Sequence, residues 1–167
     1  MRAASGRAVL QALVDADVRF LLVGGLAVNV HGYMRFTLDI DIVVQLASDN
    51  IARAFAALAL VGYEPTVPVA AEQFGDAVIR ESWVRDKNMR VLRFHSDEHF
   101  DTPVDVFASE PFAFDEEYDR AVIRELAGIG GVRVVSLSTL MRMKEAAGRP
   151  QDHADIDNLR LRMDRHE

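Results

Sequence analysis

Two aspartates lie two positions apart in the apolar run TLDIDI, residues 37–42. On a β-strand, side chains two apart point to the same face, so Asp39 and Asp41 project together while Ile40 and Ile42 face a core. Two like charges held roughly 7 Å apart repel each other, and a divalent cation between them would reverse that cost. Two-metal phosphoryl transfer needs carboxylates of this kind. For an isolated D-x-D pattern, an exposed polar face on an edge strand is the alternative interpretation.

Two further features accompany this pair. Gly24-Gly25 stands between a predicted strand and a predicted short helix, where glycines let the backbone approach a phosphate and a helix N-terminus offers N–H groups to an anion. Asp105 is centred in the apolar run VDVF and supplies a third carboxylate on a separate predicted strand. Alone, the glycines would indicate only a turn and Asp105 only a surface position. Together these residues indicate a phosphate-binding loop, a metal-binding pair and a third carboxylate in one site.

The elements that would position these residues follow from hydrophobic periodicity and from helix start and stop signals. Strands at 89–94 and 103–107 are expected to form a hairpin across a polar turn. Ser48, Asp49 and Asn50 are candidate caps for one helix, and Ser138 for another. Helices are predicted over 5–16, 26–32, 51–60, 70–74, 138–147 and 150–163, and further strands at 18–23, 39–44 and 132–135. Residues 63–88 are otherwise unreadable.

This order predicts an α/β (α+β) fold, a mixed β-sheet flanked by helices with C-terminal helices added. The 167 residues, half of them hydrophobic, suit one domain over 1–167, with a core at about 18–110 and a helical part at about 136–164. The chain has no cysteine, which excludes disulfides and Cys-ligated zinc and fits a reducing cytoplasm. Residues 1–18 do not read as a signal peptide, and no apolar run is long enough to span a bilayer.

The formal net charge is −7. Non-specific DNA binding depends on phosphate neutralisation by Lys and Arg, so an acidic chain argues against it. An enzyme that holds a nucleoside triphosphate through metal ions is not excluded, since its site carboxylates would contribute to the negative total.

The run GGLAVNVHGYMRFTLDIDIVV resembles the signature of the polymerase-β nucleotidyltransferase superfamily, a Gly-Gly or Gly-Ser turn followed about a dozen residues later by a D-x-D strand. Its spelling, G-G-x-A-x-x-x-H-G-x-x-R-x-T-x-D-I-D, is similar to AbiEii-like and related small bacterial nucleotidyltransferases, many of them toxins of toxin–antitoxin pairs. The third carboxylate, in VDVF, also matches. The resemblance extends from about Phe20 to Leu159, with residues 63–88 unassigned.

The resemblance implies a nucleotidyltransferase fold, Mg²⁺ or Mn²⁺ as cofactor, and an NTP as substrate. Asp39 and Asp41 would bind both metals and the phosphates, and Asp105 would bind the catalytic metal and help deprotonate the attacking hydroxyl. Gly24 and Gly25 would hold the triphosphate. Many members of the superfamily have Ser where this chain has Gly25, so the loop here must rely on backbone N–H groups.

Further residues are candidates for supporting roles. By the resemblance, Lys144 points back at the nucleotide, and Asp152 orients Lys144 or Arg149; a solvated surface position is the alternative for Lys144. Arg35 and Thr37 precede the D-x-D strand and are assigned to phosphate binding, with a structural ion pair as the alternative for Arg35. Asp155 is interpreted as an early helix acid that stabilises the helix dipole.

The histidines and aromatic residues are interpreted as structural. His95 and His99 lie in a polar segment read as a loop, which does not support helical zinc ligation, and His31 is expected to be a satisfied structural residue. Trp83, Phe94 and Phe100 could stack on a base, but core packing is the favoured interpretation.

Three functions compete at this point. The leading one is metal-dependent transfer of NMP from an NTP to an acceptor hydroxyl on an RNA 3′ end, a protein or a small molecule, with a cognate antitoxin as a potential partner. The second is a catalytically inactive nucleotidyltransferase-fold subunit that only binds a partner, against which three intact carboxylates count. The third is a D-x-D glycosyltransferase, which would leave Gly24-Gly25 unexplained.

Overall fold

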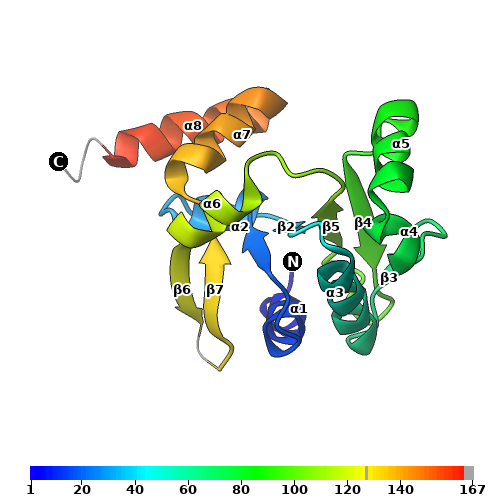
Figure 1. Ribbon diagram of the computed structural model, residues 1–167. Coiled ribbons are helices and arrows are strands. Elements are labelled where there is room, and N and C mark those ends of the chain that lie inside the picture. Colours follow the sequence, from blue (N-terminus) through cyan, green and yellow to red (C-terminus); the bar gives the residue numbers. More distant parts are fainter. Residues whose placement is uncertain (127, 164–167) are drawn as a thin grey trace.

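The computed structural model describes residues 1–126 and 128–163. Its centre is a seven-stranded mixed sheet with the strand order β3-β4-β5-β2-β1-β7-β6 (Figure 1). The strands are β1 (Phe20–Leu22), β2 (Ile40–Val44), β3 (Glu64–Pro65), β4 (Val91–His95), β5 (Val104–Phe107), β6 (Val122–Leu126) and β7 (Gly130–Val134). β2 runs parallel to β5 and β1 parallel to β7, and the other neighbours are antiparallel. The predicted mixed sheet and the hairpin formed by β4 and β5 are confirmed.

Helices border this sheet, and the last two pack against each other along one end of it (Figure 1). The helices are α1 (Ala3–Asp15), α2 (Gly24–Val30), α3 (Ser48–Leu60), α4 (Ala71–Gly75), α5 (Ala77–Lys87), α6 (Phe114–Arg120), α7 (Leu137–Ala147) and α8 (Pro150–Met163). α1 packs on α3. No helix of the described part of the chain is long and apolar enough to cross a bilayer.

The main core follows the alternation predicted for the strands. The apolar side chains that alternate along β2, β4 and β5 are at most 2% exposed. They are Ile40 and Ile42 of β2, Leu92 and Phe94 of β4, and Val104 and Val106 of β5. On α1, Val9, Leu10 and Leu13 are buried in the same cluster, and Val14 packs against it while only partly buried. Because one face of these strands is apolar, the opposite face of β2, β4 and β5 is left to carry the polar residues of the site.

The predicted helix caps are wrong in two places. Neither Ser48, Asp49 nor Asn50 caps α3, which begins at Ser48 after Ala47. Asn50 is buried and uses its side chain instead to bridge the backbone of Arg19 and Gln45, a long-range demand that local cap rules do not register. Helix α7 is capped by Ser136, whose hydroxyl accepts from the Thr139 N–H, and not by Ser138.

Several elements lie in segments without a recognisable hydrophobic pattern. The segment 63–88 contains β3, the expected short helix α4 and the longer helix α5. Helix α5 has only one buried residue, Arg80, so it lacks the apolar stripe that would reveal it. α6 and β6 were also missed, and β6 is an edge strand with no buried residue.

Candidate active site

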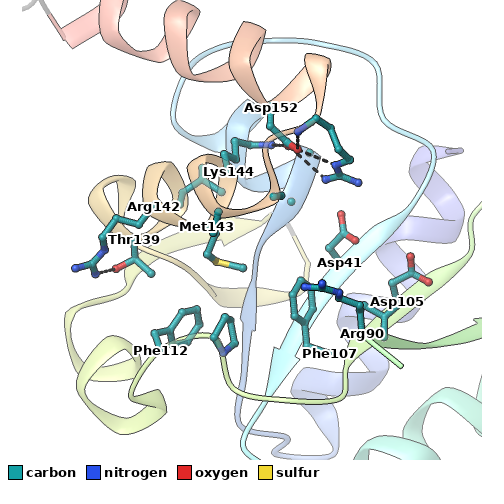
Figure 2. A pocket seen from close by; sticks show the side chains of 18 of the residues that line it. Asp41, Arg90, Asp105, Phe107, Phe112, Thr139, Arg142, Met143, Lys144 and Asp152 are labelled. Carbon is teal, nitrogen blue, oxygen red and sulfur yellow. Dashed lines mark hydrogen bonds and ion pairs between the residues drawn. The ribbon is translucent and has the colours of Figure 1, made fainter. Parts of the chain in front are cut away.

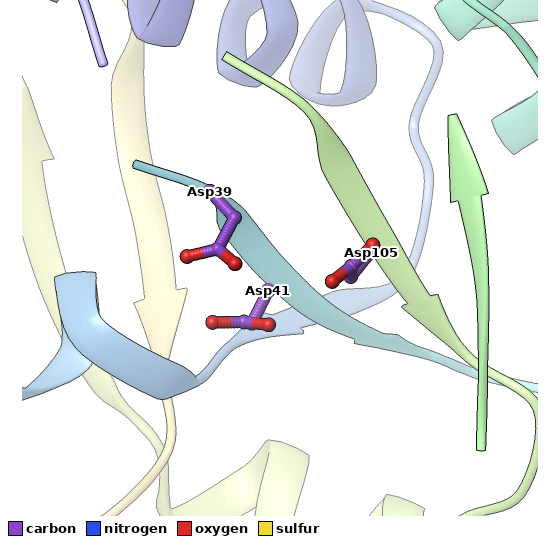
Figure 3. Close-up of side chains that lie close together, drawn as sticks. All are labelled: Asp39, Asp41 and Asp105. Carbon is purple, nitrogen blue, oxygen red and sulfur yellow. The ribbon is translucent and has the colours of Figure 1, made fainter. Parts of the chain in front are cut away.

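Two adjacent strands bring the three predicted carboxylates together. The parallel register of β2 and β5 pairs Asp41 with Asp105, and Asp39 precedes β2 by one residue. Residues directly opposite each other on neighbouring strands project from the same face of the sheet. Asp39, Asp41 and Asp105 each offer a carboxylate oxygen within 4.8 Å of the others, and Figure 3 shows them gathered on one side of the two strands. The expected convergence on one site is therefore present in the structure.

The chemistry of this cluster suits a hard divalent cation. Mg²⁺ and Mn²⁺ prefer carboxylate oxygens, which all three residues supply. Asp105 is buried, whereas Asp39 and Asp41 are half-buried and accessible from the cleft described below. The cluster thus combines close negative charges with a route by which an ion or a phosphate could enter.

Asp41 carries most of the electrostatic cost of this arrangement. Burial, followed by the negative charges of Asp39 and Asp105, raises its pKa to about 6, although Arg149 and the Gly25 backbone N–H act in the opposite direction. A cation placed beside Asp41 would favour its ionised form against both the burial and the neighbouring negative charges that raise its pKa. The pKa is still below neutral pH, so Asp41 is mainly ionised and available as a ligand there.

The Gly24-Gly25 turn is packed directly against Asp41 and Thr37. Gly24 has a φ of 62°, and a Cβ atom at that position would lie 1.9 Å from Asp41 Oδ2. A Cβ on Gly25 would lie 2.5 Å from Thr37 Oγ1. Both glycines are therefore required by the close approach of α2 to the carboxylate strand, and both line the cleft. In this conformation the Gly25 N–H is directed at Asp41.

Thr37 and Arg35, expected to bind phosphate, line the cleft but already have protein partners. The Thr37 hydroxyl donates to Asp39 Oδ1 over 3.3 Å. The Arg35 guanidinium pairs with Asp155, with Nε 2.7 Å and a terminal nitrogen 3.0 Å from the two carboxylate oxygens. The structural ion pair that was the alternative for Arg35 is thus formed.

Lys144 is buried and also paired. Its Nζ lies 3.1 Å from Asp152 Oδ1 and 2.7 Å from Asp155 Oδ2. Asp152 additionally accepts from Arg149 Nε over 2.7 Å, so it contacts both cations that it was expected to orient. Asp155 is fully buried and bridges Lys144 and Arg35, so its interpretation as a helix-dipole acid is wrong. The network ties α7 and α8 to the segment that leads into β2.

Arg93 was missed as a residue of this site. It stands opposite Asp105 in the antiparallel register of β4 and β5. Its guanidinium makes a two-pronged contact with that carboxylate, 2.7 Å from Nε to Oδ1 and 2.6 Å from a terminal nitrogen to Oδ2. The same nitrogen is 3.7 Å from Asp39 Oδ2. Buried Leu92 and Phe94 flank Arg93, so strand alternation alone would have placed it on the face of Asp105.

Asp39, Asp41 and Asp105 lie at the floor of a cleft with a volume of about 1270 Å³. The cleft extends from the carboxylates to Phe112, Thr139, Arg142 and Met143 at its other end (Figure 2). Single-ligand pockets measure about 300–1,000 Å³, so this space can hold a nucleotide together with part of a second molecule. Arginines are prominent in its lining, which favours anionic ligands in a chain that is acidic as a whole.

The remaining candidates are mostly structural, as interpreted. His31 contacts the Val135 carbonyl through Nε2 at 2.8 Å. His95 ends β4 and His99 lies in the turn after it, so no helix places them together. Trp83 packs partly and Phe94 fully into the core. The core-packing interpretation of Phe100 is wrong, since its side chain is 71% exposed and lies beside the Arg2 guanidinium.

Comparisons with known proteins identify the fold. No family model matches the chain, and no curated protein matches its sequence. Among solved structures, the lincosamide antibiotic adenylyltransferase LnuA bound to lincomycin matches with a TM-score of 0.64 at 15% identity, over 96% of this chain and 97% of that one. ANT(2")-Ia in complex with adenylyl-2"-tobramycin matches with a TM-score of 0.54 at 15% identity, over 90% of this chain and 82% of that one. The chain has the nucleotidyltransferase fold, as predicted.

Proposed function

We propose that this protein is a metal-dependent nucleotidyltransferase that moves NMP from an NTP to an acceptor hydroxyl. The observation that carries the proposal is the convergence of Asp39, Asp41 and Asp105 within 4.8 Å, at the floor of a large cleft. The nucleotidyltransferase fold supports it. The tight packing of Gly24 against Asp41 and of Gly25 against Thr37 also supports it, because it places the turn directly beside the carboxylates.

In the proposed reaction the acceptor oxygen attacks the α-phosphorus of the NTP. A bond forms between that oxygen and the α-phosphorus, the bond from the α-phosphorus to the bridging oxygen breaks, and pyrophosphate leaves. Bound Mg²⁺ or Mn²⁺ would neutralise the phosphate charge and acidify the attacking hydroxyl. Asp39 and Asp41 would hold the ions and the phosphates, and Asp105 would hold the ion nearest the acceptor and help to take its proton.

The rest of the cleft supports the triphosphate. Gly24 and Gly25 place the N-terminus of α2 beside Asp41, where backbone N–H groups and the helix dipole favour an anion. Thr37, Arg35 and Lys144 also line the cleft. Because Arg35 and Lys144 are both paired with Asp155, we propose that they attract the phosphates through their positive charge and not by direct contact. Asp152 holds Lys144 and Arg149 in place.

The acceptor and the biological role are finer parts of the proposal. Two of the matching structures contain lincomycin and adenylyl-2"-tobramycin. A small hydroxylated molecule is therefore one acceptor class to test, beside an RNA 3′ end and a protein hydroxyl. A role as the toxin of a toxin–antitoxin pair is supported by the resemblance of residues 24–41 alone. Growth arrest on expression, relieved by the product of an adjacent gene, would support that role, and normal growth would contradict it.

The experiment that tests the activity uses each of the four NTPs labelled at the α-phosphate, with Mg²⁺ or Mn²⁺ and the three acceptor classes. Transfer of label with release of pyrophosphate is expected from the wild type and not from Asp41→Asn. Asp157→Asn, at an exposed position of α8, is the matched control and should retain activity. Absence of transfer with every NTP, metal and acceptor class would contradict the proposal.

A further inference from the structure

Both carboxylate oxygens of Asp105 are occupied by the guanidinium of Arg93. The contacts of 2.7 and 2.6 Å form the parallel, two-pronged geometry in which arginine binds a carboxylate most strongly. Asp105 itself is 6% exposed, so little of it remains free for another ligand. A divalent ion that binds Asp105 must therefore either share this carboxylate with the positively charged guanidinium or displace one of its two contacts.

Arg93 also serves the rest of the cluster. An arginine guanidinium is always charged in proteins, so Arg93 brings a fixed positive charge to the carboxylates. Its terminal nitrogen lies 3.7 Å from Asp39. Of the other cations that line the cleft, Arg35 and Arg149 are bonded to acids of α8. Arg90 forms no ion pair within the described part of the chain.

We propose that Arg93 is the built-in counter-ion of the carboxylate cluster, which neutralises Asp105 while no metal is bound and competes with the metal for it. This inference rests on the metal site of the proposed function and adds a positioning residue to it. The Arg93 side chain is 48% exposed, so it can leave Asp105 without disrupting the core. The exchange of one cation for another keeps Asp105 paired in both states, which avoids a buried and uncompensated charge.

A purely structural role for Arg93 predicts the opposite effect on metal binding. If Arg93 only fixed the orientation of Asp105, its removal would loosen a ligand and weaken metal affinity. If it competes with the metal, its removal frees two oxygens and also removes a repelling positive charge, so metal affinity must rise. The direction of the change in affinity separates the two roles.

The test is a titration with Mn²⁺ alone, without nucleotide, in which free Mn²⁺ is followed by electron paramagnetic resonance. We expect Arg93→Gln to bind Mn²⁺ roughly tenfold more tightly than the wild type, the effect of losing one strong charge-assisted hydrogen bond to the competing group. Arg93→Lys keeps the charge but not the two-pronged contact and should lie between them. Arg124→Gln, which removes an equal charge from the exposed edge strand β6 outside the cleft, should change the affinity by no more than about twofold.

Each outcome bears on the inference. The inference is overturned if Arg93→Gln binds Mn²⁺ no more tightly than the wild type does. In that case the proposed function still stands, provided that the wild type binds Mn²⁺ and Asp41→Asn does not. Absence of Mn²⁺ binding in both proteins would overturn the inference and the metal site together. If Arg93→Gln does not fold, as judged by circular dichroism, Arg93→Lys decides: tighter binding than wild type supports the exchange, and equal or weaker binding overturns it.

Discussion

Replacing Asp41 by asparagine should stabilise the metal-free protein. Burial and the charges of Asp39 and Asp105 raise the Asp41 pKa from 3.8 to about 6. At about 1.4 kcal/mol per tenfold change in acidity, this corresponds to about 3 kcal/mol lost when the folded chain must carry an ionised Asp41. Asparagine has nearly the same shape and keeps an oxygen that can accept from the Gly25 N–H, but it has no charge to bury.

The pH dependence follows from the sign of the pKa change. Below the unfolded pKa of 3.8, Asp41 is mostly protonated in both the folded and the unfolded chain, so at pH 4 and below the variant and the wild type should differ by less than about 1 kcal/mol in free energy of unfolding. Between pH 4 and 6 the unfolded chain releases the proton first, and the wild type loses stability relative to the variant. Above pH 7 the difference should level off at about 3 kcal/mol.

Urea denaturation in EDTA at pH 4, 5, 6 and 8 measures this difference, with the single tryptophan, Trp83, as the fluorescent probe. For a chain of this length, about 3 kcal/mol corresponds to a rise in Tm of about 6–12 °C at pH 8. Added Mg²⁺ and NTP should stabilise the wild type more than the variant, by ligand linkage.

One result would refute this reasoning. If Asp41→Asn unfolds at a lower urea concentration than the wild type at pH 8 in EDTA, Asp41 contributes to the fold as a charged group. The metal-site interpretation would then lose its central residue. Asp157→Asn, on the exposed side of α8, should follow the wild type at every pH and controls for the loss of one acidic charge.

Three further predictions concern the surroundings of the carboxylates. Asp155→Asn should lower the free energy of unfolding by about 3 kcal/mol or more in urea titrations, because it leaves buried Lys144 short of a partner, whereas Asp157→Asn should change it little. Mn²⁺ affinity, measured by calorimetry, should fall as pH drops below about 6, since protons compete for Asp41; a flat profile from pH 5 to 8 would contradict its role as a ligand. Gly24→Ala should weaken Mn²⁺ binding and destabilise the fold, because its Cβ would collide with Asp41. Gly130→Ala, where nothing lies within 4 Å of the Cβ position, should cost only the backbone strain of about 1–2 kcal/mol. Equal effects of the two variants on Mn²⁺ affinity would contradict the packing argument.

The floor of the site was predictable because its signals are local. The alternation of Ile40 and Ile42 with Asp39 and Asp41 fixes which side chains share a face, and no long-range contact alters that parity. The hairpin of β4 and β5 was likewise visible in two alternating segments. The apolar positions around Arg93 and Asp105 contained enough information to place both on the same face, although not their direct pairing, which depends on the register across an eight-residue connection.

The rest of the site depends on contacts that no local pattern records. Lys144, Asp152 and Asp155 lie on α7 and α8, and their partner Arg35 is 120 residues away from Asp155 in the sequence. Their burial follows from how these helices pack. Local patterns do not record that packing, so they allow a solvated position as the alternative for Lys144 and suggest a helix-dipole role for Asp155. The same applies to Asn50, whose bonds to Arg19 outweighed its preference for a helix cap.

The central claim is that Asp39, Asp41 and Asp105 hold metal for an NTP whose phosphates lie at Gly24-Gly25. The most direct measurement is a crystal structure with Mn²⁺ and a non-hydrolysable NTP analogue, with the ion located by its anomalous scattering. We expect a Mn²⁺ peak about 2.0–2.3 Å from oxygens of at least two of the three aspartates, bridging to the triphosphate beside the N-terminus of α2. A Mn²⁺ ion bound elsewhere, or a triphosphate bound away from this turn with the three aspartates uncoordinated, would contradict it.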